Sequence, residues 1–99
     1  MAKARTEIIA DVTNYVRDCG GEYSDWYAGI AATPQDRLFN DHGVQEKGDS
    51  WIYRECSGSE TARGIEEYFL DRGMDGGTGG GDATTKYVYA YRKSAHSRE

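Results

Sequence analysis

The chain has 99 residues, of which 37% are hydrophobic, and it carries a formal net charge of −5 at pH 7. This length allows one domain with a modest core, and the negative charge disfavours binding to DNA or to anionic membranes unless the basic residues are gathered locally. No apolar run approaches the roughly 20 residues of a membrane span, so we expect a cytoplasmic protein with no secretory signal and no membrane contact.

The two cysteines, Cys19 and Cys56, show no C-x-x-C spacing. Without a secretory signal, reduced thiols are the expected state. A structural zinc site needs four ligands, and the two histidines, His42 and His96, do not supply the paired spacing of such sites. We therefore expect no zinc.

Apolar residues at helical spacing predict a first helix over about residues 6–18. Thr6 is a candidate cap, and the Gly20–Gly21 pair is a stop signal. The apolar positions are Ile8, Ile9, Val12, Tyr15 and Val16.

Two further helices are indicated by their ends. In the first, Thr33 begins a Thr-x-x-Asp capping box, Pro34 suits the first helical position, and Gly43 ends the helix. In the second, Ser57 begins a Ser-x-x-Glu capping box and Gly73 ends the helix. A short helix is therefore expected between Thr33 and Gly43, and a longer one between Ser57 and Gly73.

Three segments alternate at period two and predict strands at residues 22–30, 49–56 and 86–92. Because successive side chains point to opposite faces of a strand, each segment presents one set of residues to each side of a sheet. In the first strand, Trp26, Ala28 and Ile30 are expected to share one face. In the second, Trp51 and Tyr53 lie on one face and Ile52 and Arg54 on the other. In the third, one face carries Tyr87, Tyr89 and Tyr91.

The resulting order α-β-α-β-α-β predicts a small α+β domain over residues 1–92, followed by a polar tail at 93–99. We expect a three-stranded, mainly antiparallel sheet flanked by three helices. The glycine-rich segment at 73–85 does not fit regular structure. It is either a flexible connection, a source of backbone N–H groups for a phosphate, or a place from which Asp75 and Asp82 reach a metal.

Glu66 contradicts its surroundings. At about 100° per residue, the apolar stripe of the third helix passes through Ala62, Ile65 and Phe69, and Glu66 lies within it, whereas Glu67 faces outward. A buried carboxylate needs a metal, an arginine or several donors. The alternatives are a border residue with its head in water or an ion pair with an arginine, either Arg37 or Arg54.

The residues Tyr27-Ala28-Gly29, followed by Arg37 ten positions after the tyrosine and His42 five later, resemble the second half of the GIY-YIG nuclease signature. The helix with Ala62 and Glu66 in an Ala-x-x-x-Glu pattern resembles the metal-binding helix of that family. The resemblance covers about residues 23–72.

This resemblance implies a GIY-YIG-like core and phosphodiester hydrolysis on nucleic acid with one Mg²⁺ or Mn²⁺. It implies that Glu66 holds the metal, that Tyr27 is the base or positions the nucleophile, and that Arg37 clamps the phosphate. His42 would assist proton transfer. Without such a site, Tyr27 is a packing residue of the sheet and Arg37 pairs with a neighbouring aspartate, either Asp36 or Asp41.

The first strand of the family, which carries the Gly-Ile-Tyr motif, has no counterpart before residue 23. We hypothesise that the C-terminal strand lies beside the 22–30 strand in that place and offers Tyr87, Tyr89 or Tyr91 as the missing tyrosine. Tyr87 and Tyr89, with Arg54, are then the expected substrate contacts.

Two other functions compete with catalysis. One is a catalytically silent module that binds a protein or nucleotide through its tyrosine-rich face, since tyrosine is favoured at interfaces. The other is a small acidic regulator whose charge is presented to a basic partner.

Overall fold

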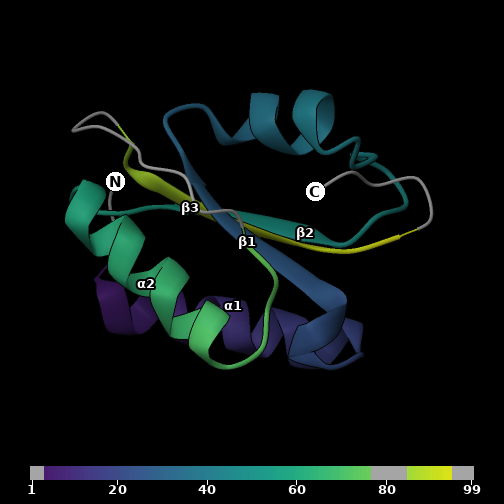
Figure 1. Ribbon diagram of the computed structural model, residues 1–99, viewed down its shortest axis with the longest axis horizontal. Helices are drawn as coiled ribbons and strands as arrows, with labels where there is room; N and C mark the ends of the chain where they lie inside the picture. The colour runs from purple at the N-terminus through teal and green to yellow at the C-terminus, as the bar shows by residue number, and fades with distance from the viewer. Residues whose placement is uncertain (1–3, 77–84, 95–99) are drawn as a thin grey trace.

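The computed structural model describes residues 4–76 and 85–94, which form a three-layered α+β domain (Figure 1). Helices α1 and α2 cover one face of an antiparallel sheet, and the short helix η2 covers the other. The elements are α1 (Arg5–Cys19), a 3₁₀ turn η1 (Tyr23–Asp25), β1 (Trp26–Ala31), η2 (Asp36–Asp41), β2 (Trp51–Glu55), α2 (Ser59–Asp71) and β3 (Tyr87–Arg92). The predicted α+β architecture is confirmed.

The sheet has the order β1-β3-β2, so the last strand lies in the centre and pairs antiparallel with both others. The hypothesis that the C-terminal strand lies beside β1 is therefore confirmed. In this register Gly29 of β1 and Tyr53 of β2 both lie opposite Tyr89.

The two faces of the sheet carry two separate hydrophobic clusters, as the period-two alternation predicts. Helices α1 and α2 pack on the first face, and η2 packs on the second. The cluster under the two helices includes Ile8, Val12, Trp26, Ala28, Ile52, Ile65, Phe69 and Val88. The cluster under η2 consists of Tyr27, Ala31, Leu38, Val44, Tyr89 and Tyr91, with Phe39, Trp51 and Tyr53 packed against it.

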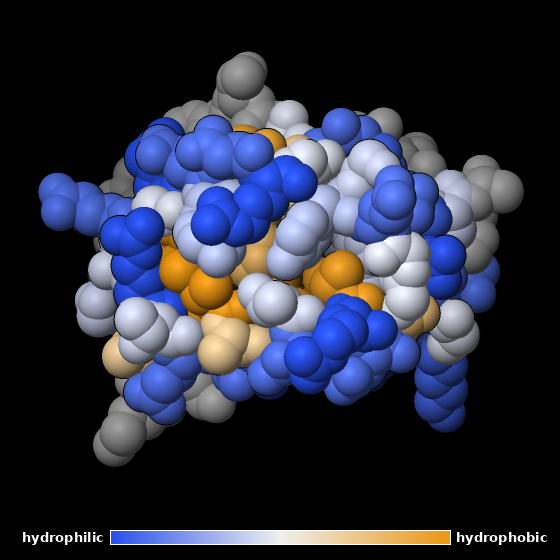
Figure 2. All heavy atoms as spheres, turned by 90° about the horizontal axis from the view of Figure 1, so that it is seen from below, coloured by the Kyte–Doolittle hydropathy of each residue, from blue (hydrophilic) through white to orange (hydrophobic). Residues whose placement is uncertain are grey.

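The outer surface of the helical layer is mostly hydrophilic, with hydrophobic atoms visible in its middle (Figure 2). Ile9, Tyr68 and Leu70 are among the partly buried residues that pack against the core from this layer. In the described ranges, no helix is long and apolar enough to cross a membrane.

Several predicted helix ends are wrong in detail. Neither α1 nor α2 has a side-chain cap: Ala4 and Gly58 occupy the N-cap positions, and the Ser57 hydroxyl instead lies 3.1 Å from that of Thr61. The short helix begins at Pro34, as predicted, but among the described residues the Thr33 side chain makes no capping hydrogen bond, so the box predicted there does not form. A stop at Gly73 is confirmed, because this residue follows α2 with a φ of +117°, which favours glycine.

The first strand is shorter than predicted, because Tyr23–Asp25 form the 3₁₀ turn. The backbone N–H of Glu22 donates to Oδ2 of Asp25 at 3.0 Å, and the backbone N–H of Asp25 donates to the Glu22 side chain, which stabilises this turn. The chain after α2 then returns to β1: Asp75 N–H donates to Trp26 O at 2.9 Å, and Ala28 N–H donates to Asp75 O at 2.8 Å. An ion pair with Lys93 holds the Asp75 side chain.

Candidate functional site

The short helix η2 is a π-helix, and this geometry aligns two of the predicted site residues. Its last turn is closed by the N–H of His42, which donates to the carbonyl of Arg37 at 2.9 Å, a bond between residues five apart. In an α-helix, five residues advance about 140° beyond a full turn. The wider turn instead places Arg37 and His42 one turn apart, so both can reach the same region beside β1.

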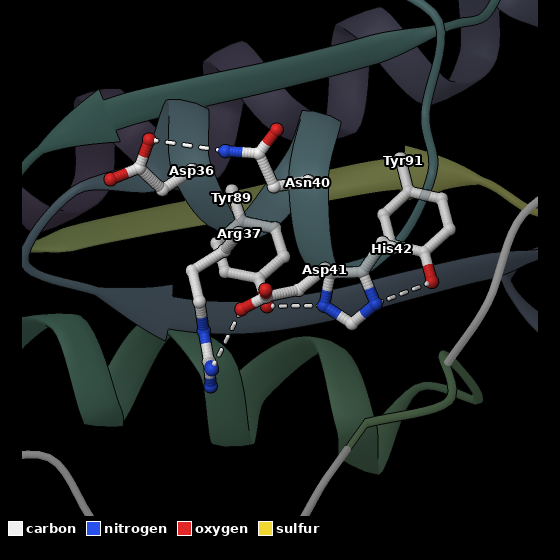
Figure 3. Close-up of polar contacts among 7 residues, drawn as sticks. All are labelled: Asp36, Arg37, Asn40, Asp41, His42, Tyr89 and Tyr91. Atoms are coloured by element: carbon white, nitrogen blue, oxygen red, sulfur yellow. Dashed lines mark hydrogen bonds and ion pairs between the residues drawn. The ribbon is translucent and has the colours of Figure 1, made fainter.

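His42 lies between two tyrosine hydroxyls of the central strand (Figure 3). Its Nε2 is 2.8 Å from the hydroxyl of Tyr89, and its Nδ1 is 3.2 Å from the hydroxyl of Tyr91. All three side chains are buried, with exposed fractions of 6%, 2% and 0%. Because a neutral imidazole has one donor and one acceptor, one tyrosine donates to it and the other accepts.

The position of Tyr89 depends on the glycine opposite it. A Cβ atom at Gly29 would lie 2.4 Å from the Tyr89 hydroxyl oxygen and 2.5 Å from its Cζ. The ring of Tyr89 therefore crosses the main chain of β1, the edge strand, where no side chain intervenes. This brings the hydroxyl from the centre of the sheet toward its edge.

Charged side chains from both layers affect the pKa of Tyr89. Burial raises the pKa of Tyr89 far above the ordinary value of 10.0, and the nearby Tyr27 raises it further. The guanidinium of Arg37 on η2 opposes this rise in pKa by its charge and a hydrogen bond. The charge of Glu66 on α2, from the opposite layer, adds to it. Tyr89 is therefore a neutral phenol at neutral pH.

Glu66 is buried in α2, as the helical pattern predicts, with an exposed fraction of 7%. Burial raises the pKa of its carboxyl group, while Arg63 lowers it. Within the described ranges, no residue makes a hydrogen bond or close ion pair with Glu66, so the predicted alternative of an ion pair with Arg37 or Arg54 is not formed. No fully buried side-chain oxygen in the described ranges lacks a hydrogen-bond partner, so the carboxylate of Glu66 keeps contact with solvent, as the predicted alternative of a border residue requires.

Glu66 is a single carboxylate, not part of a preformed metal cage. Across residues 4–76 and 85–94, no three His, Cys, Asp or Glu side chains come together in a way that could hold a metal. Mg²⁺ is commonly held by one or two carboxylates, with water and substrate phosphates completing its shell. Glu66 meets that minimum. The two cysteines are free thiols, and His96 and Asp82 lie outside the described residues.

Tyr27 lies in the same cluster, with an exposed fraction of 9%. Its ring stacks on Tyr91 at a centroid distance of 5.3 Å and lies 4.7 Å from the ring of His42. Arg37 forms the ion pair predicted as an alternative, with 3.2 Å between its Nη1 and Oδ2 of Asp41. Beside Arg37 is a pocket of about 310 Å³, lined by Ile30, Ala31, Ala32, Thr33, Asp36, Arg37 and Thr85.

Two predicted substrate contacts lie elsewhere. Arg54 is on β2, at the edge of the sheet opposite β1, where its Nε is 3.0 Å from Asp11. Tyr87 is half-buried and its ring meets that of Tyr53 at 6.1 Å. Tyr91, one of the three candidate tyrosines of the C-terminal strand, is the second partner of His42. The signal for it was its place two residues from Tyr89 on the same face.

Comparisons of the chain with protein-family models, with curated proteins and with solved structures found no match.

Proposed function

We propose that this protein is a metal-dependent hydrolase of phosphodiester bonds in nucleic acid, with a divergent GIY-YIG-like site. One observation carries the proposal: the hydroxyl of Tyr89 is 2.8 Å from Nε2 of His42, with the side chain of Arg37 beside them (Figure 3). A phenol, an imidazole and a guanidinium thus lie together on β3 and η2 and the residue that follows η2, while Glu66 on α2 acts on Tyr89 through its charge. This set is suited to moving a proton beside an anion.

Proton transfer is assigned to Tyr89 and His42. The attacking water gives its proton to the Tyr89 oxygen while Tyr89 passes its own proton to Nε2 of His42. The water oxygen bonds to phosphorus, and the bond from phosphorus to the leaving oxygen breaks. This direction requires the tautomer in which Nδ1–H donates to Tyr91, so Tyr91 orients the imidazole. Tyr27 supports the arrangement by stacking on Tyr91.

Arg37 and Glu66 are assigned to the negative charge of the phosphate: Arg37 would bind it directly, and Glu66 would do so through a metal ion. The planar fork of Arg37 matches two oxygens of a phosphate. Glu66 is the residue that would hold Mg²⁺ or Mn²⁺, and when bound the ion supplies positive charge for the oxygens of the phosphate in the transition state. The molecule is acidic overall, so the positive charge of Arg37 and of the bound ion would be needed to attract a nucleic acid.

The test is incubation of the pure protein with labelled single- and double-stranded DNA and RNA, at low salt, with Mg²⁺ or Mn²⁺. We expect Glu66→Gln and Tyr89→Phe to lower the cleavage rate about 100-fold or more, the scale of general acid–base contributions. Glu67→Gln and Tyr23→Phe are the matched controls and keep wild-type rates. Failure to cleave any of the four substrates with either metal, or equal rates for Glu66→Gln and Glu67→Gln, contradicts the proposal.

A binding module without catalysis is the second candidate, and the aromatic edge of β2 favours it. Most of the tyrosine-rich face is covered by η2, but Trp51 and Tyr53 are only half-buried, and their rings are parallel within 9° at 5.9 Å. Such an exposed pair is typical of an interface anchor. If no cleavage is found, loss of a captured protein partner on Trp51→Ala, but not on Tyr89→Phe, supports this function.

A further inference from the structure

The ion pair between Arg37 and Asp41 lies where the proposed function requires a phosphate. Nη1 of Arg37 is 3.2 Å from Oδ2 of Asp41, and this is a single contact rather than a two-pronged one. Figure 3 shows the two side chains on the same side of η2, away from Asp36 and Asn40. An exposed aspartate therefore occupies part of the guanidinium that would bind substrate.

The pair is weak enough to be displaced. Both side chains are about half exposed, 53% and 54%, and they are four residues apart on one helix. Exposed pairs of this kind contribute little to stability. A phosphate can accept two parallel hydrogen bonds from the guanidinium and is the stronger partner. Because Asp41 is tethered beside Arg37, however, it competes at every substrate concentration, and its charge repels an incoming anion.

Asp36 offers an internal comparison. It is exposed on the same helix and carries the same charge, but its side chain accepts a hydrogen bond from Asn40 at 3.5 Å instead of pairing with Arg37. The two aspartates therefore differ in what they contact, while their contribution to net charge is equal.

We propose that Asp41 is a specificity-determining residue, an internal anion that occupies Arg37 in the ligand-free molecule and sets the affinity for phosphate. This inference rests on the proposed function, because it takes Arg37 as the phosphate ligand. Asp41 thereby rejects weak anions and admits substrates whose further contacts outweigh its competition.

The experiment measures binding of a fluorescein-labelled oligothymidylate of twelve nucleotides by fluorescence anisotropy, in EDTA so that no cleavage occurs. We expect Asp41→Asn to bind about threefold to tenfold more tightly than Asp36→Asn, the scale of removing one nearby like charge and one competing partner. The gain disappears when Asp41→Asn is combined with Arg37→Gln. Circular dichroism confirms that each variant is folded.

Three results overturn the inference: equal affinities for Asp41→Asn and Asp36→Asn, a gain that persists without Arg37, or no binding by Asp41→Asn at any concentration reached. Failure of the proposed function is seen separately, in the cleavage assay. Cleavage by the wild type with equal affinities for the two aspartate variants removes only the role of Asp41. A binding gain that needs Arg37, with no cleavage by any variant, keeps that role and removes the nuclease.

Discussion

Glu66 carries a negative charge into a position that the packing of α2 otherwise fills with apolar side chains. Its neighbours in the stripe, Ala62, Ile65 and Phe69, are fully or almost fully buried. Burial raises the pKa of the Glu66 carboxyl above its ordinary value of 4.5, which means that the folded state holds the proton more tightly than the unfolded state does. The charged form at neutral pH therefore lowers the stability of the fold.

The substitution Glu66→Gln separates stability from function. We expect it to raise the free energy of unfolding at pH 7.5 by about 1 kcal/mol, because a neutral amide replaces a partly desolvated charge. At pH 4 wild type and variant have similar stabilities, because Glu66 is then largely protonated in both states. As pH rises past the ordinary pKa of 4.5 and through the raised one, wild type loses stability relative to the variant. Urea unfolding at both pH values checks this, with the exposed Glu67→Gln as control.

A second residue-scale prediction concerns Gly29. Its backbone is not in the left-handed region, so alanine is conformationally allowed, but the added Cβ would meet the buried ring of Tyr89 at 2.4–2.5 Å. We expect Gly29→Ala to lower stability by about 1–3 kcal/mol, as overpacking does. The substitution Gly29→Ala also moves the Tyr89 hydroxyl away from His42. In a Tyr89→Ala background most of the stability cost disappears, which a double-mutant cycle in urea measures. An equal cost in both backgrounds rules out the clash.

At the scale of the element, η2 is a small helix that carries two charged or titratable groups of the site. It is held on the sheet by Leu38, which is fully buried, and by His42 between its two tyrosines. The neighbouring Phe39 lies at the border, where its ring meets Trp51 edge-on at 5.1 Å. The position of Arg37 therefore depends on how firmly Leu38 fixes this helix.

We expect Leu38→Ala to lower the free energy of unfolding by about 2–5 kcal/mol, the range for a buried leucine. Phe39→Ala is the comparison from the same helix, and its cost is smaller because the side chain is only half-buried. At a temperature where Leu38→Ala is still folded, its cleavage rate falls as well, because Arg37 and His42 are no longer held beside Tyr89. If Leu38→Ala is as stable as wild type, Leu38 does not hold η2 on the sheet.

The sequence predicts those elements whose signal lies in the spacing of side chains. Period-two alternation predicted which residues of β1, β2 and β3 share a face, and the helical period predicted the burial of Glu66. The π turn of η2 was not predictable, because a bond from His42 to Arg37 rather than to Leu38 leaves no local mark in the sequence. The alternation of side chains does not reveal the order of the strands in the sheet. That order places β2, and with it Arg54, at the edge of the sheet opposite β1, which the sequence could not show.

At the scale of the whole molecule, the residues of the proposed site come from the sheet and from both of the layers that cover it. The two hydrophobic clusters are built from protein side chains on either side of that sheet, and we expect them to form without a bound ion. Glu66 is a residue of the helical layer whose charge affects the pKa of Tyr89. Metal binding should therefore add stability to a molecule that is already folded, and should do so through one side chain.

Removal of divalent metal with EDTA is accordingly expected to abolish cleavage and leave the protein folded. Addition of Mg²⁺ at ten times its dissociation constant raises the free energy of unfolding by about 1.4 kcal/mol, as for any ligand that binds only the native state. Glu66→Gln loses this increment and Glu67→Gln keeps it, in urea titrations at constant ionic strength. Equal stabilisation of both variants would show that Mg²⁺ binds nonspecifically to the acidic surface of the protein and not at Glu66.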